Sequence, residues 1–229
     1  MLLLAAAAAL SLALPRPPVP QSAAEPAKHE AQIKFSFDNP KLDPSSYTLV
    51  FSENGSGHYK SVPGQNVGTD DPQLIAPQPV DRNIQIGEPL RSEVFHLARA
   101  KHYFAITCEA PDSHIAFTGT KTFNYTGPDG QGSCSFNYSR DQQVNNLAEE
   151  MMAVAYTLEE GRRLTVELQH GRLSLDSELE ALQDALNDHR AAEIANIADV
   201  LQAIANDENV MNRARRRAQA LLRGDTSKH

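Results

Sequence analysis

Residues 48–61 read TLVFSENGSGHYKS, and this stretch decides how the first half of the chain folds. Leu49 and Phe51 stand at every second position, which is the period of a half-buried strand. Asn54-Gly55 tolerates the positive φ angles of a tight hairpin turn, and residues 58–62 then form the returning strand. The stretch therefore predicts a β-hairpin in which Asn54-Gly55 serves the chain reversal rather than a ligand.

The same alternation recurs twice along the chain. Residues 33–37 read IKFSF, and residues 120–139 read TKTFNYTGPDGQGSCSFNYS, with a Gly-Pro-Asp-Gly turn between two alternating runs. Apolar residues at helical spacing follow each hairpin, over residues 88–102 and from Asp141 onward. We therefore expect two hairpin-helix units that build an antiparallel sheet of four or five strands, with helices packed on one face.

The composition changes sharply near residue 140. Beyond it the chain has no proline and is rich in Ala, Leu, Glu and Arg, and past Gly161 it reads as helices to the end. This pattern predicts the α+β class, with a strand-rich region and first helix over residues 25–140 and a helical region over residues 141–229. The spacing leaves open whether the last helices pack on the sheet or form a small helical subdomain.

Residues 63–87 contain several prolines and polar residues, with Ile84 and Ile86 at the edge of a strand. Loops longer than about 12–15 residues are uncommon and are often functional. We expect a long irregular loop here and a contact surface on it.

The N-terminus predicts export. Fourteen apolar residues, MLLLAAAAALSLAL, precede a proline-rich stretch, and such a run is too short to span a bilayer but suits a signal peptide. Small residues at Ser22-Ala23-Ala24 place the cleavage after Ala24, so residues 1–24 form the signal peptide. The mature chain is then periplasmic or secreted, without a transmembrane segment. A disordered Ala/Pro-rich tail is the alternative.

The two cysteines, Cys108 and Cys134, predict one disulfide in an exported chain. The functional alternative is a nucleophilic or metal-binding thiol. Neither cysteine has the close Cys or His spacing of such sites, so the disulfide is the better interpretation.

The charge balance disfavours two classes of partner. The formal net charge is −8, and removal of Arg16 with the signal peptide makes it −9. Nucleic acid and anionic membrane surfaces repel such a chain at long range. With no Trp and 6% aromatic residues, an aromatic sugar-binding platform has little material.

Motifs for catalysis, metal or cofactor binding do not emerge. The eight histidines have no i, i+4 pair, no Gly-x-Ser-x-Gly elbow occurs, and residues 127–132 lack the Lys-Ser/Thr ending of a phosphate loop. Glu149-Glu150 and Glu159-Glu160 diverge on a helix, so we interpret them as solvated faces, although paired catalytic acids stay open. We predict no catalytic, metal-binding or cofactor-binding residues and leave the ligand-binding residues open.

RARRR, residues 213–217, concentrates four arginines on the last predicted helix. They either complement the negative end of that helix dipole or dock on an acidic neighbouring helix or a partner.

The ENGSGHY hairpin, the PL...VF.LA helix and the GTKTF.Y.GPDG.GSC.FNYS segment resemble small exported proteins of soil bacteria, a group without an assigned activity. The hairpin-helix layout is also similar to β-lactamase-inhibitor-protein and PepSY-type modules. That resemblance implies binding of proteins rather than catalysis.

We therefore expect an exported, non-catalytic binding or protein-interaction module, whose partner is another envelope or secreted protein. One alternative is a small hydrolase-type envelope enzyme with an active site assembled from distant residues. Another is a structural envelope component whose helices self-associate. The sequence leaves the oligomeric state open.

Overall fold

The computed structural model describes residues 30–64, 78–110 and 114–225. The predicted signal peptide and most of the predicted long loop, residues 65–77, lie outside this part of the chain.

The strands form one sheet in which every pair of neighbours is antiparallel, in the order β4-β3-β2-β1-β5-β6. The strands are β1 (Gln32–Asp38), β2 (Ser46–Ser52), β3 (Ser56–Val62), β4 (Asp81–Gln85), β5 (Thr120–Gly127) and β6 (Gly130–Phe136). The α+β prediction is confirmed, but the sheet has six strands rather than four or five. The additional strand is β4, which is short and follows the long loop, so its alternation is weak in the sequence.

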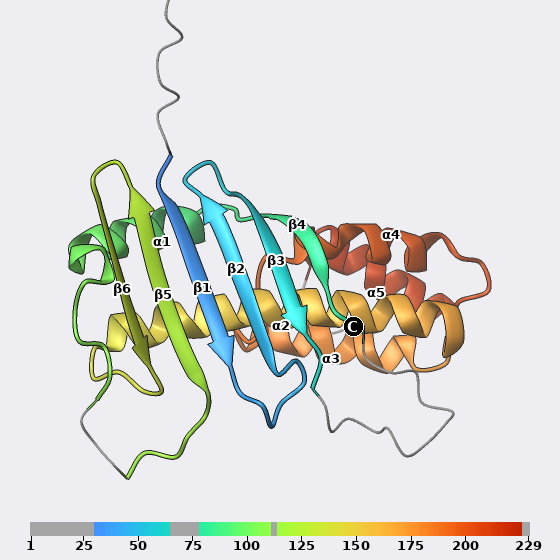
Figure 1. The fold of residues 1–229 in the computed structure, drawn as a ribbon. Coiled ribbons are helices and arrows are strands. Elements are labelled where there is room, and N and C mark those ends of the chain that lie inside the picture. Colours follow the sequence, from blue (N-terminus) through green and yellow to red (C-terminus); the bar gives the residue numbers. More distant parts are fainter. Residues whose placement is uncertain (1–29, 65–77, 111–113, 226–229) are drawn as a thin grey trace, which may run out of the picture.

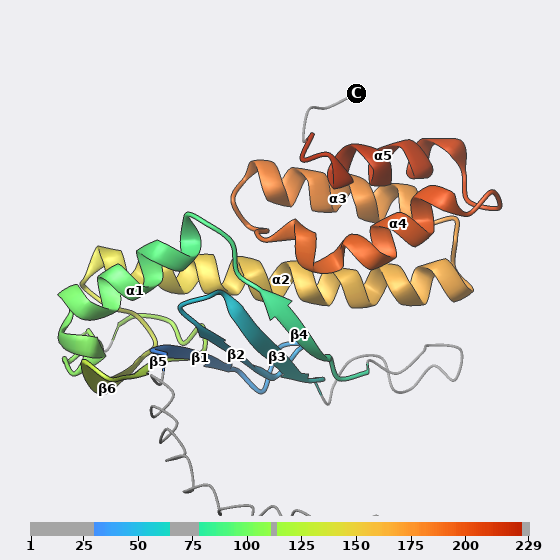
Figure 2. The same cartoon turned by 90° about the horizontal axis from the view of Figure 1, so that it is seen from above.

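The helices all lie on one side of this sheet (Figures 1 and 2). They are α1 (Leu90–Ala100), η1 (His102–Phe104), α2 (Gln142–His170), α3 (Leu175–Asn187), η2 (Ile194–Ile197), α4 (Ala198–Asn206) and α5 (Asn212–Leu222). Within the described residues, none of them is long and apolar enough to cross a membrane.

The predicted hairpin joins β2 and β3. Gly55 has a φ of 85°, and the side chain of Asn54 accepts a hydrogen bond from the backbone N–H of Ser56 at 2.7 Å. Both residues therefore serve the turn, as the sequence predicts. A Cβ atom on Gly55 would also clash with the carbonyl oxygen of Ile86, so only glycine fits here.

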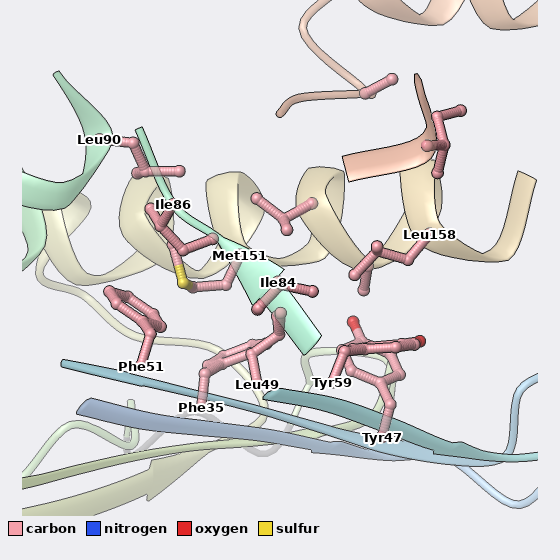
Figure 3. Packing of buried hydrophobic residues seen from close by; sticks show 14 of the residues in the cluster. Phe35, Tyr47, Leu49, Phe51, Tyr59, Ile84, Ile86, Leu90, Met151 and Leu158 are labelled. Carbon is pink, nitrogen blue, oxygen red and sulfur yellow. The ribbon is translucent and has the colours of Figure 1, made fainter. Parts of the chain in front are cut away.

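The core lies between the sheet and α2. Phe35, Leu49 and Phe51 point from the sheet toward the helix, while Met151 and Leu158 point back from it (Figure 3). All five are buried. Burial of such a side chain contributes about 1.5–3 kcal/mol, so this layer supplies much of the stability.

Helix α2 runs on through Gly161 without a break and carries both halves of the molecule. Its first half covers the sheet, while its second half packs with the C-terminal helices (Figure 2). A Cβ atom on Gly161 would clash with Ile197, so the glycine allows η2 to approach the helix closely. This close approach explains why residue 161 is a glycine, and the helix does not end there.

Candidate functional site

A groove of about 530 Å³ opens between the β1–β2 loop, α2 and the segment that follows α3. We call it the tyrosine groove. Its apolar wall is formed by Phe37, Leu42, Pro44, Tyr47, Met152 and Tyr156. Its polar rim is formed by Asp43, Glu149, Arg163, Asp188, His189 and Arg190.

Local structure explains how these residues meet. Tyr47 is the first inward-facing residue of β2, so it points from the sheet toward α2 (Figure 3). Glu149, Met152, Tyr156 and Glu159 recur at three- and four-residue intervals, which puts them on one face of α2. The groove is therefore lined by one inward-facing residue from each of β1 and β2, and by one stripe of α2.

Glu159 lies at the floor of the groove and is only 6% exposed. The Tyr59 hydroxyl donates to its Oε1 at 2.9 Å, and the Arg162 Nε donates to its Oε2 at 2.9 Å. Arg162 lies in addition 3.7 Å from the carboxylate of Asp43. Both oxygens of this buried carboxylate therefore have a donor, as a buried charge requires.

The neighbouring phenols stay protonated. Burial, and then the charge on Glu159, raise the pKa of Tyr47 well above that of an ordinary tyrosine. The same causes, in the same order, raise the pKa of Tyr59 even further. At neutral pH neither hydroxyl can act as a base, and that of Tyr47, which lines the groove, can donate a hydrogen bond to a ligand.

The segment after α3 forms the far side of the groove in a strained conformation. His189 and Glu193 have positive φ angles of 58° and 56°, which are uncommon for residues other than glycine. The segment is fixed to α2, because the backbone N–H of Ala192 donates to the Thr157 hydroxyl at 3.0 Å. Strain that the surroundings maintain in this way is typical of functional sites.

A second, smaller cavity of about 370 Å³ lies on the other side of this segment, and its lining includes Glu93, Glu150 and Glu193. Burial and the nearby charge of Glu93 raise the pKa of Glu150, whose Oε2 is buried without a hydrogen-bond partner among the described residues. Burial also raises the pKa of Glu193, and a hydrogen bond from Gly87 partly offsets this effect. Ionisation of these carboxyls is therefore less favourable here than in water.

The predicted disulfide is confirmed. Cys108, in the loop after η1, is bonded to Cys134 on β6, and no free cysteine occurs in the described residues. The bond ties this loop to the sheet.

The histidines that the structure describes do not gather at one site. His189 lines the groove, while His58 lies on β3 with its Nε2 2.8 Å from the carboxylate of Asp81. In the part of the chain that the structure describes, no group of three His, Cys, Asp or Glu side chains could hold a metal ion.

Two interpretations of charged residues need correction. Glu159 and Glu160 are buried rather than solvated, and each is paired with the arginine three residues further on. Their signal in the sequence is EEGRR, in which every acid has a base at i+3.

The arginines of residues 213–217 lie in the first half of α5, so the interpretation from the C-terminal dipole is wrong. The alternative, docking on an acidic helix, is what the structure contains. Arg213 and Arg217 both pair with the buried Asp176 of α3, and Arg217 also lies 3.2 Å from Glu180. A groove of about 480 Å³ follows this arginine face.

A comparison with protein-family models finds no match to the chain, and a comparison with curated proteins finds none either. The functional argument therefore depends on the residues of the groove.

Proposed function

We propose that this chain is an exported, non-catalytic binding protein that holds an apolar segment of another exported polypeptide in the tyrosine groove. The observation that carries this proposal is an apolar wall with a rim on which both arginines are already paired. Arg163 pairs with Glu160, and Arg190 lies 3.2 Å from Asp188. Such a rim attracts a free ion only weakly, whereas an apolar wall with a few polar groups is the usual form of a binding site.

The mouth of the groove supports a polypeptide as the ligand. Leu42 is 47% exposed there, and an apolar side chain at a site rimmed by polar residues is typical of an interaction surface. The rim carries both signs of charge, so it suits a segment in which an apolar anchor is flanked by charged residues. The protonated hydroxyl of Tyr47 can donate to a backbone carbonyl of that segment.

Selection of binders from a displayed peptide library, followed by titration of the selected peptides, tests this proposal. We expect peptides with an apolar anchor, and we expect Leu42→Asp and Tyr156→Ala to weaken their binding at least about tenfold, which corresponds to roughly 1.4 kcal/mol. Phe117→Asp is the matched control, because Phe117 is a 58% exposed apolar residue outside the groove. Selected peptides that bind all three variants as tightly as the original chain would contradict the proposal.

A small hydrolase-type enzyme is the second candidate. One observation favours it, because the groove brings His189 together with the carboxylates of Asp43, Glu149 and Asp188. A hydrolase screen tests this alternative. Turnover that His189→Ala abolishes and that His96→Ala, an exposed substitution on α1, leaves intact would establish an enzyme.

Export is supported by the disulfide, because such bonds persist mainly in oxidising compartments. Fusion of residues 1–24 to a reporter that is active only outside the cytoplasm tests it. A reporter that stays inactive with this leader, but works with a known leader, would contradict export.

A further inference from the structure

We propose that a groove along α5 binds an acidic segment of a partner polypeptide, and that Arg216 and Arg223 hold its carboxylates. We call it the arginine groove. It has a volume of about 480 Å³ and is lined by four arginines, two glutamines and one alanine. The tyrosine groove shares none of these residues, so the inference is independent of the function proposed for that site.

Helix α5 presents the arginine groove at the surface of the molecule. Figure 2 shows α3 and α4 between α5 and α2, so the outer side of α5 faces away from the sheet. Arg216 and Arg223 are exposed and seven residues apart, which places them on the same side of the helix, about 10.5 Å apart along its axis. Ala220 lies one turn from each, and its small side chain leaves the space between the two arginines.

Two of the four arginines have no partner. Among the residues that the structure describes, no acidic side chain pairs with Arg216 or Arg223, and none lines the groove. Most arginines in this part of the chain do have a carboxylate partner, so these two are exceptions. The groove is therefore a local positive site on a chain whose formal net charge is −8.

The other two arginines show how carboxylates bind to this helix. Arg213 and Arg217 both pair with Asp176 of α3, and Arg217 lies 3.2 Å from Glu180 as well. A guanidinium group suits such contacts, because its N–H groups match the two oxygens of a carboxylate. An acidic segment on the outer side of α5 would repeat with the unpaired arginines what α3 does with the paired ones.

The length of the groove favours a chain over a single ion. From Arg213 to Arg223 the helix rises about 15 Å, which four or five residues of an extended segment span at about 3.3 Å each. An inorganic anion such as phosphate has no second charged group for the second unpaired arginine. Nucleic acid is a long anion too, but its dense charge makes repulsion by an acidic chain far stronger than that of a short acidic peptide. We therefore infer a polypeptide segment that carries a few Asp or Glu residues.

The contact should be weak on its own. An exposed ion pair contributes little in water, and the formal net charge of −8 opposes the approach of an acidic segment. The groove therefore suits a reversible contact, and it selects carboxylates by its local charge rather than by the charge of the whole chain.

Fluorescence anisotropy with two labelled octapeptides tests the proposal, one of alternating Glu and Ser and the other of alternating Gln and Ser. We expect the chain to bind the Glu peptide and not the Gln peptide. Arg216→Gln/Arg223→Gln should weaken binding of the Glu peptide at least about fivefold, because both unpaired guanidinium groups are lost. Lys34→Gln/Arg140→Gln is the matched control, since it changes the net charge equally at two exposed residues outside the groove, and it should bind like the original chain.

Circular dichroism verifies that the variants are folded, which the exposure of the substituted side chains favours. Unchanged binding by the Arg216→Gln/Arg223→Gln variant would overturn the proposal. So would an equal loss in the control, because net charge alone would then explain the binding. The proposal also fails if the chain does not distinguish the two peptides, or if inorganic phosphate displaces the Glu peptide at equal concentration, which would assign the groove to a small anion.

Discussion

Asn196 covers the outer edge of β4 by binding both backbone groups of Gln85. The backbone N–H of Gln85 donates to Asn196 Oδ1 at 2.7 Å, and Asn196 Nδ2 donates to the carbonyl oxygen of Gln85 at 3.0 Å. A side-chain amide has one donor and one acceptor in the arrangement that a neighbouring strand would offer. The side chain therefore stands in for one residue of a further strand and attaches the C-terminal helices to the sheet.

Substitution of Asn196 by Ala should lower the free energy of unfolding by about 1–3 kcal/mol, because two hydrogen bonds to Gln85 and one to the carbonyl oxygen of Glu193 are lost. Urea denaturation followed by circular dichroism measures the effect. Asn206→Ala, an exposed substitution at the end of α4, is the control and should change stability by less than about 0.5 kcal/mol. Equal stability of both variants would show that the contact with Gln85 contributes nothing.

Substitution of two glycines with positive φ distinguishes the effect of backbone strain on stability from that of a steric clash. Gly55 has a φ of 85° and Gly224 a φ of 72°, but a Cβ atom would clash with Ile86 only at Gly55. Gly224→Ala should cost about 1–2 kcal/mol from the left-handed conformation alone. Gly55→Ala should cost more, and thermal unfolding of both variants gives the difference. A smaller loss for Gly55→Ala would contradict the assignment of Gly55 to a crowded turn.

Loss of the disulfide should lower stability by roughly 3 kcal/mol, because Cys108 and Cys134 are 26 residues apart and the bond restricts the unfolded chain. Urea denaturation of the Cys108→Ala/Cys134→Ala double variant measures this loss. Addition of a reductant should destabilise the original chain but leave the double variant unchanged. If the reductant destabilised both equally, the effect would not come from this bond.

The partly buried carboxyl of Glu150 should make stability depend on pH. A group whose pKa is raised in the folded state favours folding fully below its unfolded-state value, here 4.5, and this contribution is lost as the pH rises through the raised value. Glu150→Gln should therefore be more stable than the original chain at pH 7, and the gap should close below about pH 4.5. Urea denaturation across this range, with the exposed Glu208→Gln as the control, is the measurement.

The fold could be predicted to the extent that local patterns determine it. The alternation around Leu49 and the Asn54-Gly55 turn specify the β2–β3 hairpin, and two cysteines leave one internal pairing. The helical second half follows from composition. β4 is the least distinct strand, because it has only one buried residue, Ile84, and its pairing with β3 is set by tertiary contacts.

The tyrosine groove could not be predicted in this way. It joins Tyr47, Tyr156 and His189, which are far apart in the sequence and have no common motif. The sequence predicts a solvated Glu159, because periodicity does not show that this side chain faces the sheet and accepts a hydrogen bond from Tyr59 of β3. The local signal for its burial is Arg162 at i+3, because an arginine at this spacing can neutralise a buried carboxylate.

Helix α2 also sets the orientation of the C-terminal helices relative to the sheet. Because it is continuous from Gln142 to His170, the number of residues along it sets how the C-terminal helices are rotated about the axis relative to the sheet. One residue inserted near Gly161 would turn the second half by about 100° and advance it by about 1.5 Å. Asn196 would then move away from β4. We therefore expect this fold to tolerate insertions and deletions in its loops but not in α2.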